Sequence, residues 1–162
     1  MQVLHVIALL LVAITMAMAL AHALEYPGKL RLSKESYLAT QTIYYPGFTF
    51  GGICEVGGIV ALVALLFLTP LGTLRFWLIA VALALMLSVQ AIFWLVTQPV
   101  NKFWIKDLDL HAAGGRFFSL GGTKEVRDWK ELRDIWEYSH MARSVLAMLS
   151  LIAVTVALAS NP

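Results

Sequence analysis

Charged residues and cysteine are both scarce in this chain. Of its 162 residues, 14% are charged and 60% are hydrophobic, which is more apolar surface than a soluble domain of this size needs. The one cysteine, Cys54, excludes an intramolecular disulfide and a C-x-x-C redox motif. The net charge is only +2, and no cluster of basic residues is free of acidic ones, which argues against nucleic-acid binding.

Long apolar runs dominate the chain instead. Four segments, at about residues 3–24, 48–68, 74–96 and 141–159, have the roughly 17–25 residues that a helix needs to cross a bilayer. The first is predicted to be a retained span and not a signal peptide, because no Lys or Arg precedes it. The sequence therefore predicts an all-α, four-span transmembrane helix bundle, a single integral membrane domain of residues 1–162 in the lipid bilayer.

The loops differ in their positive charge. Loop one, residues 25–47, and loop three, residues 97–140, share one side and hold nearly all the Lys and Arg residues, while Arg75 alone lies near the second loop. The positive-inside rule places loops one and three in the cytoplasm and both termini outside. Loop three is predicted to be long and partly helical, because opposite charges spaced i,i+4 over residues 124–137 favour a protruding helix that continues into the last span.

Two spans carry a face that we expect to turn toward other helices. In the second span this face combines a carboxylate with small residues that let helices approach closely: Gly47, Gly51, Glu55 and Gly58. In the third span it is a polar stripe: Gln90, Trp94, Thr97 and Asn101.

Polar residues gather at one end of the predicted bundle. The end of the first span, the start of the second, the end of the third and the start of the fourth lie on the same side. These ends carry His22, Glu25, Glu55, Asn101, Glu137, His140 and Arg143. Ionisable groups are costly to keep in a membrane and mark a functional site by default.

One hypothesis for this cluster is a metal site. Glu137-x-x-His140 and the mirror-ordered His22-x-x-Glu25 each put a carboxylate and an imidazole on one helix face. Four-helix bundles that bind two iron ions use such steps, and mixed His and carboxylate ligands suit iron, manganese or zinc. The predicted ligands are His22, Glu55, Glu137 and His140, with Glu25 and Asn101 as supporting residues.

Three alternatives stay open. Ion pairs alone could account for the charges, with Glu137 bound to Arg133 on its own helix and Glu55 bound to Arg143 across the bundle. Two facing histidines, His22 and His140, also permit axial ligation of a haem. Without any cofactor, His140 or Glu55 could serve as a base that abstracts a substrate proton; the family resemblance described next implies a base as well, and there His22 joins these two as a candidate catalytic group.

Several stretches carry a family resemblance. They are residues 24–32 (LEYPGKLRL), 37–44 (YLATQTIY), 93–94 (FW), 99–102 (PVNK) and 132–140 (LRDIWEYSH). The chain resembles, over most of its length, the bacterial branch of the anthrone-oxygenase-like family of small four-span membrane proteins, a family with a domain of unknown function. The resemblance implies a bacterial inner-membrane protein and an oxygenase for a reduced aromatic such as an anthrone or quinol. Trp94, Trp136 and Tyr45 would then line a flat apolar pocket.

Two classes of function follow as expectations. The first is a small oxidoreductase or oxygenase-like protein that acts on a lipophilic reduced aromatic at the His and Glu cluster, with or without a metal. The second is a non-catalytic accessory or assembly subunit of a larger membrane complex, or a homo-oligomer, because glycine-lined spans and tryptophans also suit helix packing between proteins.

Overall fold

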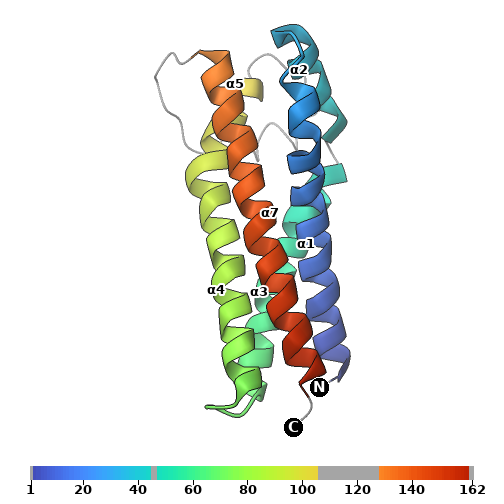
Figure 1. Ribbon diagram of the computed structural model, residues 1–162, viewed down its shortest axis with the longest axis vertical. Helices are drawn as coiled ribbons and strands as arrows, with labels where there is room; N and C mark the ends of the chain where they lie inside the picture. The colour runs from blue at the N-terminus through green and yellow to red at the C-terminus, as the bar shows by residue number, and fades with distance from the viewer. Residues whose placement is uncertain (1, 45–46, 106–127, 161–162) are drawn as a thin grey trace.

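Four long helices run the length of the molecule (Figure 1). The computed structural model describes residues 2–44, 47–105 and 128–160. The long helices are α1 (Gln2–Lys29), α3 (Gly47–Leu68), α4 (Leu74–Ile92) and α7 (Trp129–Ala159). All four are long and apolar enough to cross a membrane, α4 together with the helical residues that continue it to Asn101. The described residues contain no strand, so the predicted all-α, four-span bundle is confirmed, and the chain is a small integral membrane protein.

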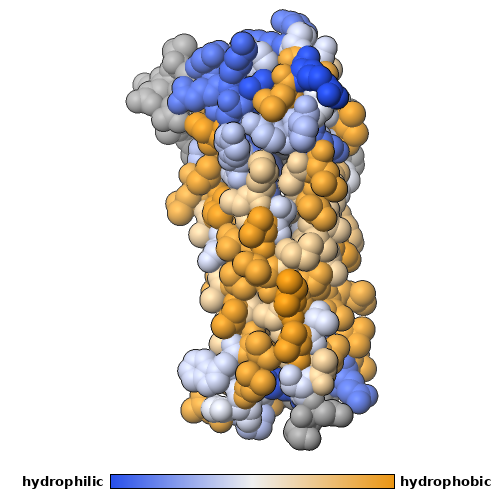
Figure 2. Space-filling model, in the orientation of Figure 1, coloured by the Kyte–Doolittle hydropathy of each residue, from blue (hydrophilic) through white to orange (hydrophobic). Residues whose placement is uncertain are grey.

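The helices pack as a closed ring. α1 lies against α3 and α7, and α4 lies against the same two helices. Both termini lie at one end, which we call the terminal end, while α2 and α5 lie at the other, the loop end (Figure 1). An apolar surface covers the middle of the bundle, and hydrophilic residues gather at the loop end (Figure 2). The chain thus presents to lipid the apolar band that a spanning bundle requires.

Short elements shape the loop end. They are α2 (Lys34–Gln41), the 3-10 turn η1 (Thr42–Tyr44), the π-helix η2 (Phe93–Thr97) and α5 (Gln98–Ile105). The Ser33 hydroxyl accepts a hydrogen bond from the Ser36 backbone N–H and so caps the start of α2. In η2 the Gln98 N–H bonds the carbonyl of Phe93, five residues back. This wider turn precedes Pro99, which has no N–H and would crowd a regular helix.

The helices extend past the predicted span bounds. α1 continues to Lys29, the third span continues as helix to Ile105, and α7 begins at Trp129, well before residue 141. These extensions are stable because they bury their own apolar cluster, formed by Tyr37, Val100, Leu132 and Trp136. The start of α7 is therefore packed against the bundle and does not protrude, contrary to the prediction. Residues 106–127, which include the rest of the predicted loop helix, lie outside the described residues.

A second apolar core fills the terminal-end half. It is made of small and branched side chains from all four long helices: Ala8, Val12, Ala61, Leu62, Leu65, Ile79, Ala82, Met86, Ala153, Val154 and Ala157. At its far end Arg75 of α4 donates to the carbonyls of Ala157 (3.0 Å) and Ser160 (2.8 Å). This arginine satisfies carbonyl groups that the end of α7 leaves without helical partners.

Small residues of α3 allow its close approach to α1. A Cβ atom on Gly51 would lie 2.4 Å from the Met18 sulfur, and one on Gly58 would meet Leu11 and Met86 at 3.6 Å. The predicted helix-facing role is confirmed for these two glycines and for buried Glu55. It is wrong for Gly47, which is exposed and has no described atom within 4 Å of a Cβ position. Gly47 is the first residue of α3, a position at which the neighbouring helix is too far away for contact.

Candidate functional site

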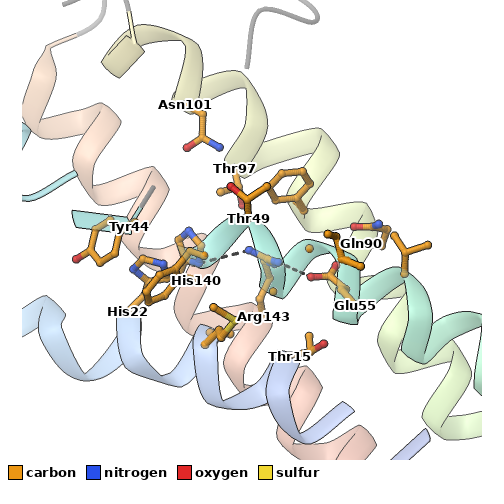
Figure 3. A pocket seen from close by; sticks show the side chains of 18 of the residues that line it. Thr15, His22, Tyr44, Thr49, Glu55, Gln90, Thr97, Asn101, His140 and Arg143 are labelled. Carbon is orange, nitrogen blue, oxygen red and sulfur yellow. Dashed lines mark hydrogen bonds and ion pairs between the residues drawn. The ribbon is translucent and has the colours of Figure 1, made fainter. Parts of the chain in front are cut away.

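The side chains of His22, Glu55, His140 and Arg143 meet in the loop-end half of the bundle (Figure 3). They come from α1, α3 and α7, and all four are buried. On α7, His140 and Arg143 lie between Trp136, which belongs to the loop-end apolar cluster, and Ala153, which belongs to the terminal-end core. The site is therefore a polar layer between two apolar ones.

Arg143 and Glu55 form a buried ion pair. Arg143 Nη2 donates to Glu55 Oε2 at 2.6 Å, so the pairing predicted across the bundle is confirmed. The guanidinium carbon also lies 5.1 Å from the centre of the Phe93 ring of η2. Glu55 Oε1 and Arg143 Nε meet no hydrogen-bond partner among the described residues. The pair thus keeps one acceptor and one donor that a bound molecule can use.

The two imidazoles are in contact, with their ring planes tilted by 41°, but they are not equivalent. Their ring centres are 4.2 Å apart, and Arg143 Nη1 lies 3.4 Å from His140 Nδ1. Because a guanidinium only donates, His140 Nδ1 must accept, and the proton of the neutral ring belongs on Nε2. His22 Nδ1 has no hydrogen-bond partner among the described residues and lies 4.0 Å from Glu25 Oε2. Arg143 therefore fixes His140, whereas the Nδ1 atom of His22 is buried on the side of Glu25.

Aromatic rings enclose the imidazole pair. The His22 ring centre lies 4.4 Å from Tyr44, 4.6 Å from Phe48 and 4.9 Å from Trp136. Trp136 also stacks on His140 at 4.2 Å. These contacts hold both imidazoles in one orientation and keep water away from them.

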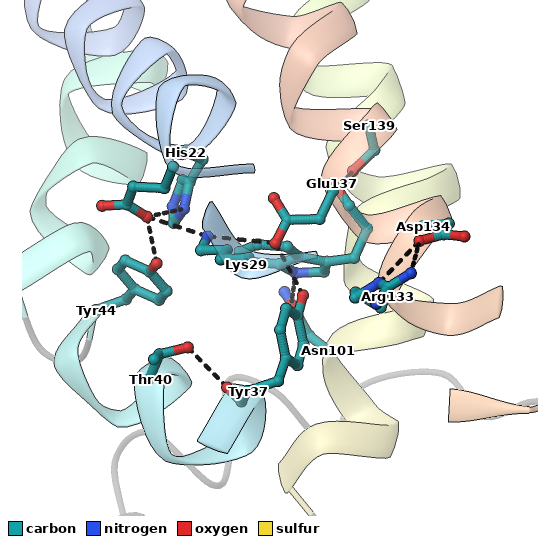
Figure 4. A network of polar contacts seen from close by, with 12 residues as sticks. His22, Lys29, Tyr37, Thr40, Tyr44, Asn101, Arg133, Asp134, Glu137 and Ser139 are labelled. Carbon is teal, nitrogen blue, oxygen red and sulfur yellow. Dashed lines mark hydrogen bonds and ion pairs between the residues drawn. The ribbon is translucent and has the colours of Figure 1, made fainter. Parts of the chain in front are cut away.

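A second polar layer lies on the loop-end side of the imidazoles (Figure 4). Lys29 Nζ is 3.0 Å from Glu25 Oε2 and 3.3 Å from Glu137 Oε1, and it joins the two carboxylates. Tyr37 donates its hydroxyl to Glu137 Oε1 at 3.0 Å, and Tyr44 donates to Glu25. We call these five residues the loop-end polar layer. It ties α1, α2, η1 and α7 together.

Both tyrosines of this layer remain neutral donors at ordinary pH. Burial raises the pKa of Tyr37, and the negative charge of Glu137 raises it further. Burial also raises the pKa of Tyr44, and the hydrogen bond to Glu25 adds to the shift. Each hydroxyl therefore keeps the proton that it donates to a carboxylate.

The predicted pair of Glu137 with Arg133 is wrong. Arg133 Nε and Nη2 donate instead to Asp134 Oδ1, at 2.8 and 2.7 Å. Glu137 is fully buried and points into the bundle, where Lys29 of α1 reaches it, whereas the Asp134 side chain is 41% exposed. The cross-bundle contact replaces the one on the same helix because it neutralises a carboxylate that water cannot reach.

The polar stripe predicted to face other helices does so at Thr97 and Asn101, which contact α7, whereas Trp94 is 45% exposed. Trp136 Nε1 donates to Asn101 Oδ1 at 2.7 Å, and the hydroxyls of Thr97 and Ser139 are 2.8 Å apart. Asn101 Nδ2 donates in turn to Gln98 Oε1 at 3.2 Å. These bonds fix the Trp136 indole, and thus one wall of the space beside the histidines.

A cavity of about 690 Å³ adjoins the two histidines and the ion pair. This size is in the usual range of small-molecule sites. Its walls come from all four long helices and η2, and they are largely apolar, with aromatic side chains prominent: Tyr44, Phe48, Phe93, Trp94 and Trp136. Trp94 and Trp136 thus line a pocket as the resemblance implies, whereas Tyr45 lies outside the described residues. His22, Glu55, His140 and Arg143 supply most of the charged or titratable groups on the wall.

The four predicted metal ligands do not converge on one point. The described part of the chain holds no group of three or more His, Cys, Asp or Glu side chains that could bind a metal ion. Glu55 is engaged by Arg143, and Glu137 by Lys29 and Tyr37 in the other layer. A haem between His22 and His140 does not fit this arrangement either, because rings 4.2 Å apart are already in contact and leave no space for a porphyrin plane.

Sequence reasoning missed Lys29 and Tyr37 as site residues. Lys29 was counted only as a loop charge, and Tyr37 only as part of the stretch 37–44 that carries the family resemblance. A signal for Lys29 was present, since His22, Glu25 and Lys29 are spaced three and four apart and share one face once α1 is extended to Lys29. Tyr37 reaches Glu137 from a separate helix, 100 residues away in the chain, and no local pattern indicates that contact.

Comparisons of the chain with protein-family models, with curated proteins and with solved structures found no match.

Proposed function

We propose that this protein is a membrane-embedded oxidoreductase that binds a lipophilic reduced aromatic in the 690 Å³ cavity and assists its oxidation. One observation carries the proposal. The apolar cavity has two imidazoles in contact beside a buried arginine, so a base and a cation adjoin the same space. The resemblance to the anthrone-oxygenase-like family suggests the substrate class, a phenolic anthrone or quinol.

The side chains divide the work in this proposal. The substrate ring lies among Phe48, Trp94 and Trp136, which offer flat apolar faces. His22, whose ring belongs to the cavity wall, accepts the acidic proton. Arg143 stabilises the resulting anion, and its charge acts strongly because the site excludes water.

The reaction balances with molecular oxygen as the oxidant. Deprotonation of the central CH₂ of an anthrone gives a phenolate-type anion, which transfers electrons to oxygen and forms a new C–O bond. The resulting hydroperoxide loses water, so CH₂ and O₂ become C=O and H₂O. The proton taken by His22 returns to the departing water, and the protein ends unchanged.

Reconstituted protein can test this directly. The full chain in lipid nanodiscs is mixed with 1,8-dihydroxyanthrone, and oxygen uptake and anthraquinone absorbance are followed above a blank of empty nanodiscs. General-base removal typically costs on the order of 100-fold or more in rate, which we expect for His22→Gln. His5→Gln is the matched control, because His5 is also a buried histidine of α1 but lies in the terminal-end half; its rate should stay within about twofold.

Two results would count against the proposal. A wild-type rate equal to the blank would remove the activity, and an unchanged rate in His22→Gln would remove the base. Stable co-purification with a larger membrane complex, unaffected by His22→Gln, would favour the accessory-subunit alternative instead.

We propose the bacterial inner membrane as the location, with the loop end in the cytoplasm. The positive charges of Lys29, Arg31 and Lys34 at the loop end support this side. A reporter domain that works only outside the cytoplasm should then be active when it is fused after Pro162. A C-terminus reported in the cytoplasm would reverse the assignment.

A further inference from the structure

The walls of the cavity are not equally shielded. On α1 and α7 the lining residues His22, Trp136, His140 and Arg143 are buried. On α3 and η2 the lining includes exposed side chains, with Ile53 at 67% and Trp94 at 45% of full exposure. The cavity therefore opens sideways, between α3 and η2, on the outer surface of the bundle.

This opening lies along membrane-spanning helices. Ile53 and Trp94 both belong to segments long and apolar enough to cross a bilayer. Gly52 and Ile53 lie within the first two turns of α3, roughly 10 Å from its start at the loop end. The opening thus lies near the depth where headgroups meet the hydrocarbon, a region in which amphipathic aromatic molecules concentrate.

The loop-end polar layer closes the other side. Lys29 and Glu137 are buried, and the ion pair between them spans α1 and α7 directly beyond the imidazoles. Tyr37 and Tyr44 bind the two carboxylates from α2 and η1. A molecule that passed through this layer would break charged contacts in a buried place, at a cost of several kcal/mol.

One glycine keeps the sideways opening clear. A Cβ atom on Gly52 would have no described atom within 4 Å, although Gly52 belongs to the cavity wall. Its neighbour Gly51 is different, because a Cβ there would collide with Met18 of α1. Gly51 therefore serves packing, whereas the space in front of Gly52 is part of the opening.

We propose that the ligand of this site enters laterally from the bilayer through the opening between α3 and η2, and that Gly52 and Trp94 form its threshold. This inference rests on the proposed function, because it concerns the route to the same cavity. It also restricts the ligand class. The ligand is dissolved in the membrane, with a flat ring that passes Trp94 and a polar group that reaches His22 and Arg143.

Gly52→Leu tests the route with a matched control. Leucine at position 52 fills the opening without a clash, and Gly47→Leu introduces the same side chain at another open position of α3 outside the cavity wall. Both changes favour the helix, so neither should unfold the protein. The probe is 1,8-dihydroxyanthraquinone added in vesicle lipid, and its association is followed by quenching of tryptophan fluorescence. We expect association at least tenfold slower in Gly52→Leu and within twofold of wild type in Gly47→Leu.

A tethered probe separates the two routes. An octadecyl ether of the same anthraquinone stays anchored in the bilayer and should still bind wild-type protein, with the same sensitivity to Gly52→Leu. Equal association rates in Gly52→Leu and Gly47→Leu, or binding of the short probe alone, would overturn lateral access. No binding of either probe to wild type would instead contradict the proposed function, so the two failures are distinguishable.

Discussion

The terminal-end half of the bundle and its loop-end half use the same four helices for different purposes. In the terminal-end half, alanines and branched side chains such as Leu65 and Ile79 interlock, and Ser150 donates to the Ala82 carbonyl at 2.9 Å. The loop-end half contains two ion-paired layers, two imidazoles in contact and a cavity. One half is a packed scaffold, and the other keeps open space that its own side chains do not fill.

The difference shows where a small membrane protein can place a site. A polar layer deep in the terminal-end half would lie far from the loops that supply its partners. At the loop end, α2 and η1 bring Tyr37 and Tyr44 to carboxylates of α1 and α7. The site thus lies at the depth where membrane helices still receive hydrogen bonds from loop residues, and the apolar scaffold holds its walls in place.

The largest expected effect comes from Arg143, the buried arginine of the loop-end half, and its substitution tests this comparison directly. Arg143→Met leaves Glu55 as an uncompensated charge in a buried place, and we expect a loss of about 3–5 kcal/mol in the free energy of unfolding. SDS titration in mild detergent, with tryptophan fluorescence as the readout, measures the loss. The double variant Glu55→Leu/Arg143→Met should regain most of it, since no unpaired charge remains. An Arg143→Met protein as stable as wild type would mean that water reaches Glu55.

The glycines of α3 provide a smaller test within one helical turn. Gly51→Val forces its side chain against the Met18 sulfur, where even a Cβ would be 2.4 Å away, and overpacking of this kind costs about 1–3 kcal/mol. A Cβ atom at position 52 meets no described atom within 4 Å, so Gly52→Val should not lower stability. Both are compared by the same SDS titration. Met18→Ala should rescue Gly51→Val by making room, and equal effects of the two glycine changes would contradict the assigned packing role.

The pH dependence of stability tests the loop-end polar layer. The pKa of Tyr37 is raised in the folded protein by burial and by Glu137, so the folded state keeps a proton that the unfolded chain releases above about pH 10. Stability from this group is complete below that pH and falls as the pH rises, by at most about 1.4 kcal/mol per pH unit. Tyr37→Phe should show a shallower decline between pH 10 and 11, because it loses the Tyr37 contribution and keeps that of Tyr44. Parallel curves for the two proteins would place Tyr37 in contact with water.

The scaffold was more predictable from the sequence than the site. Apolar length determines the four spans, and the glycine spacing on α3 correctly indicated close contact for Gly51 and Gly58. The pair of Glu55 with Arg143 could also be predicted, because a buried guanidinium needs an anion at its own depth. Partners at the loop end were harder. Lys29 reaches Glu137 only because α1 continues past its apolar run. A prediction from hydropathy ends the helix where that run ends.

The shape of the cavity was beyond sequence reasoning, although the resemblance implied a pocket lined by Trp94 and Trp136. Its shape depends on η2, whose wider turn places Phe93 and Trp94 beside α3 and Arg143. Pro99 marks the position, but a proline near the end of a span more often predicts a kink or an end than a π-helix. The contact between the two imidazoles likewise depends on how far α1 is rotated about its axis relative to α7. The periodicity of the sequence does not determine this rotation to better than a fraction of a turn.

The smallest expected effect comes from Arg75, the arginine at the terminal end, and it sharpens the comparison between the two halves. Among the described residues, Arg75 binds the carbonyls of Ala157 and Ser160 at the end of α7, so its removal leaves no described carboxylate without a partner. Arg75→Met should therefore cost about 0.3–1 kcal/mol, the usual value of a cation at a helix C-terminus, against the several kcal/mol expected for Arg143→Met. Arg75→Lys keeps the charge and should retain part of the stability in the same SDS titration. If Arg75→Met were as costly as Arg143→Met, the carboxylate partner would not explain the sensitivity of the loop-end half. The loss of an arginine would then be enough to explain it.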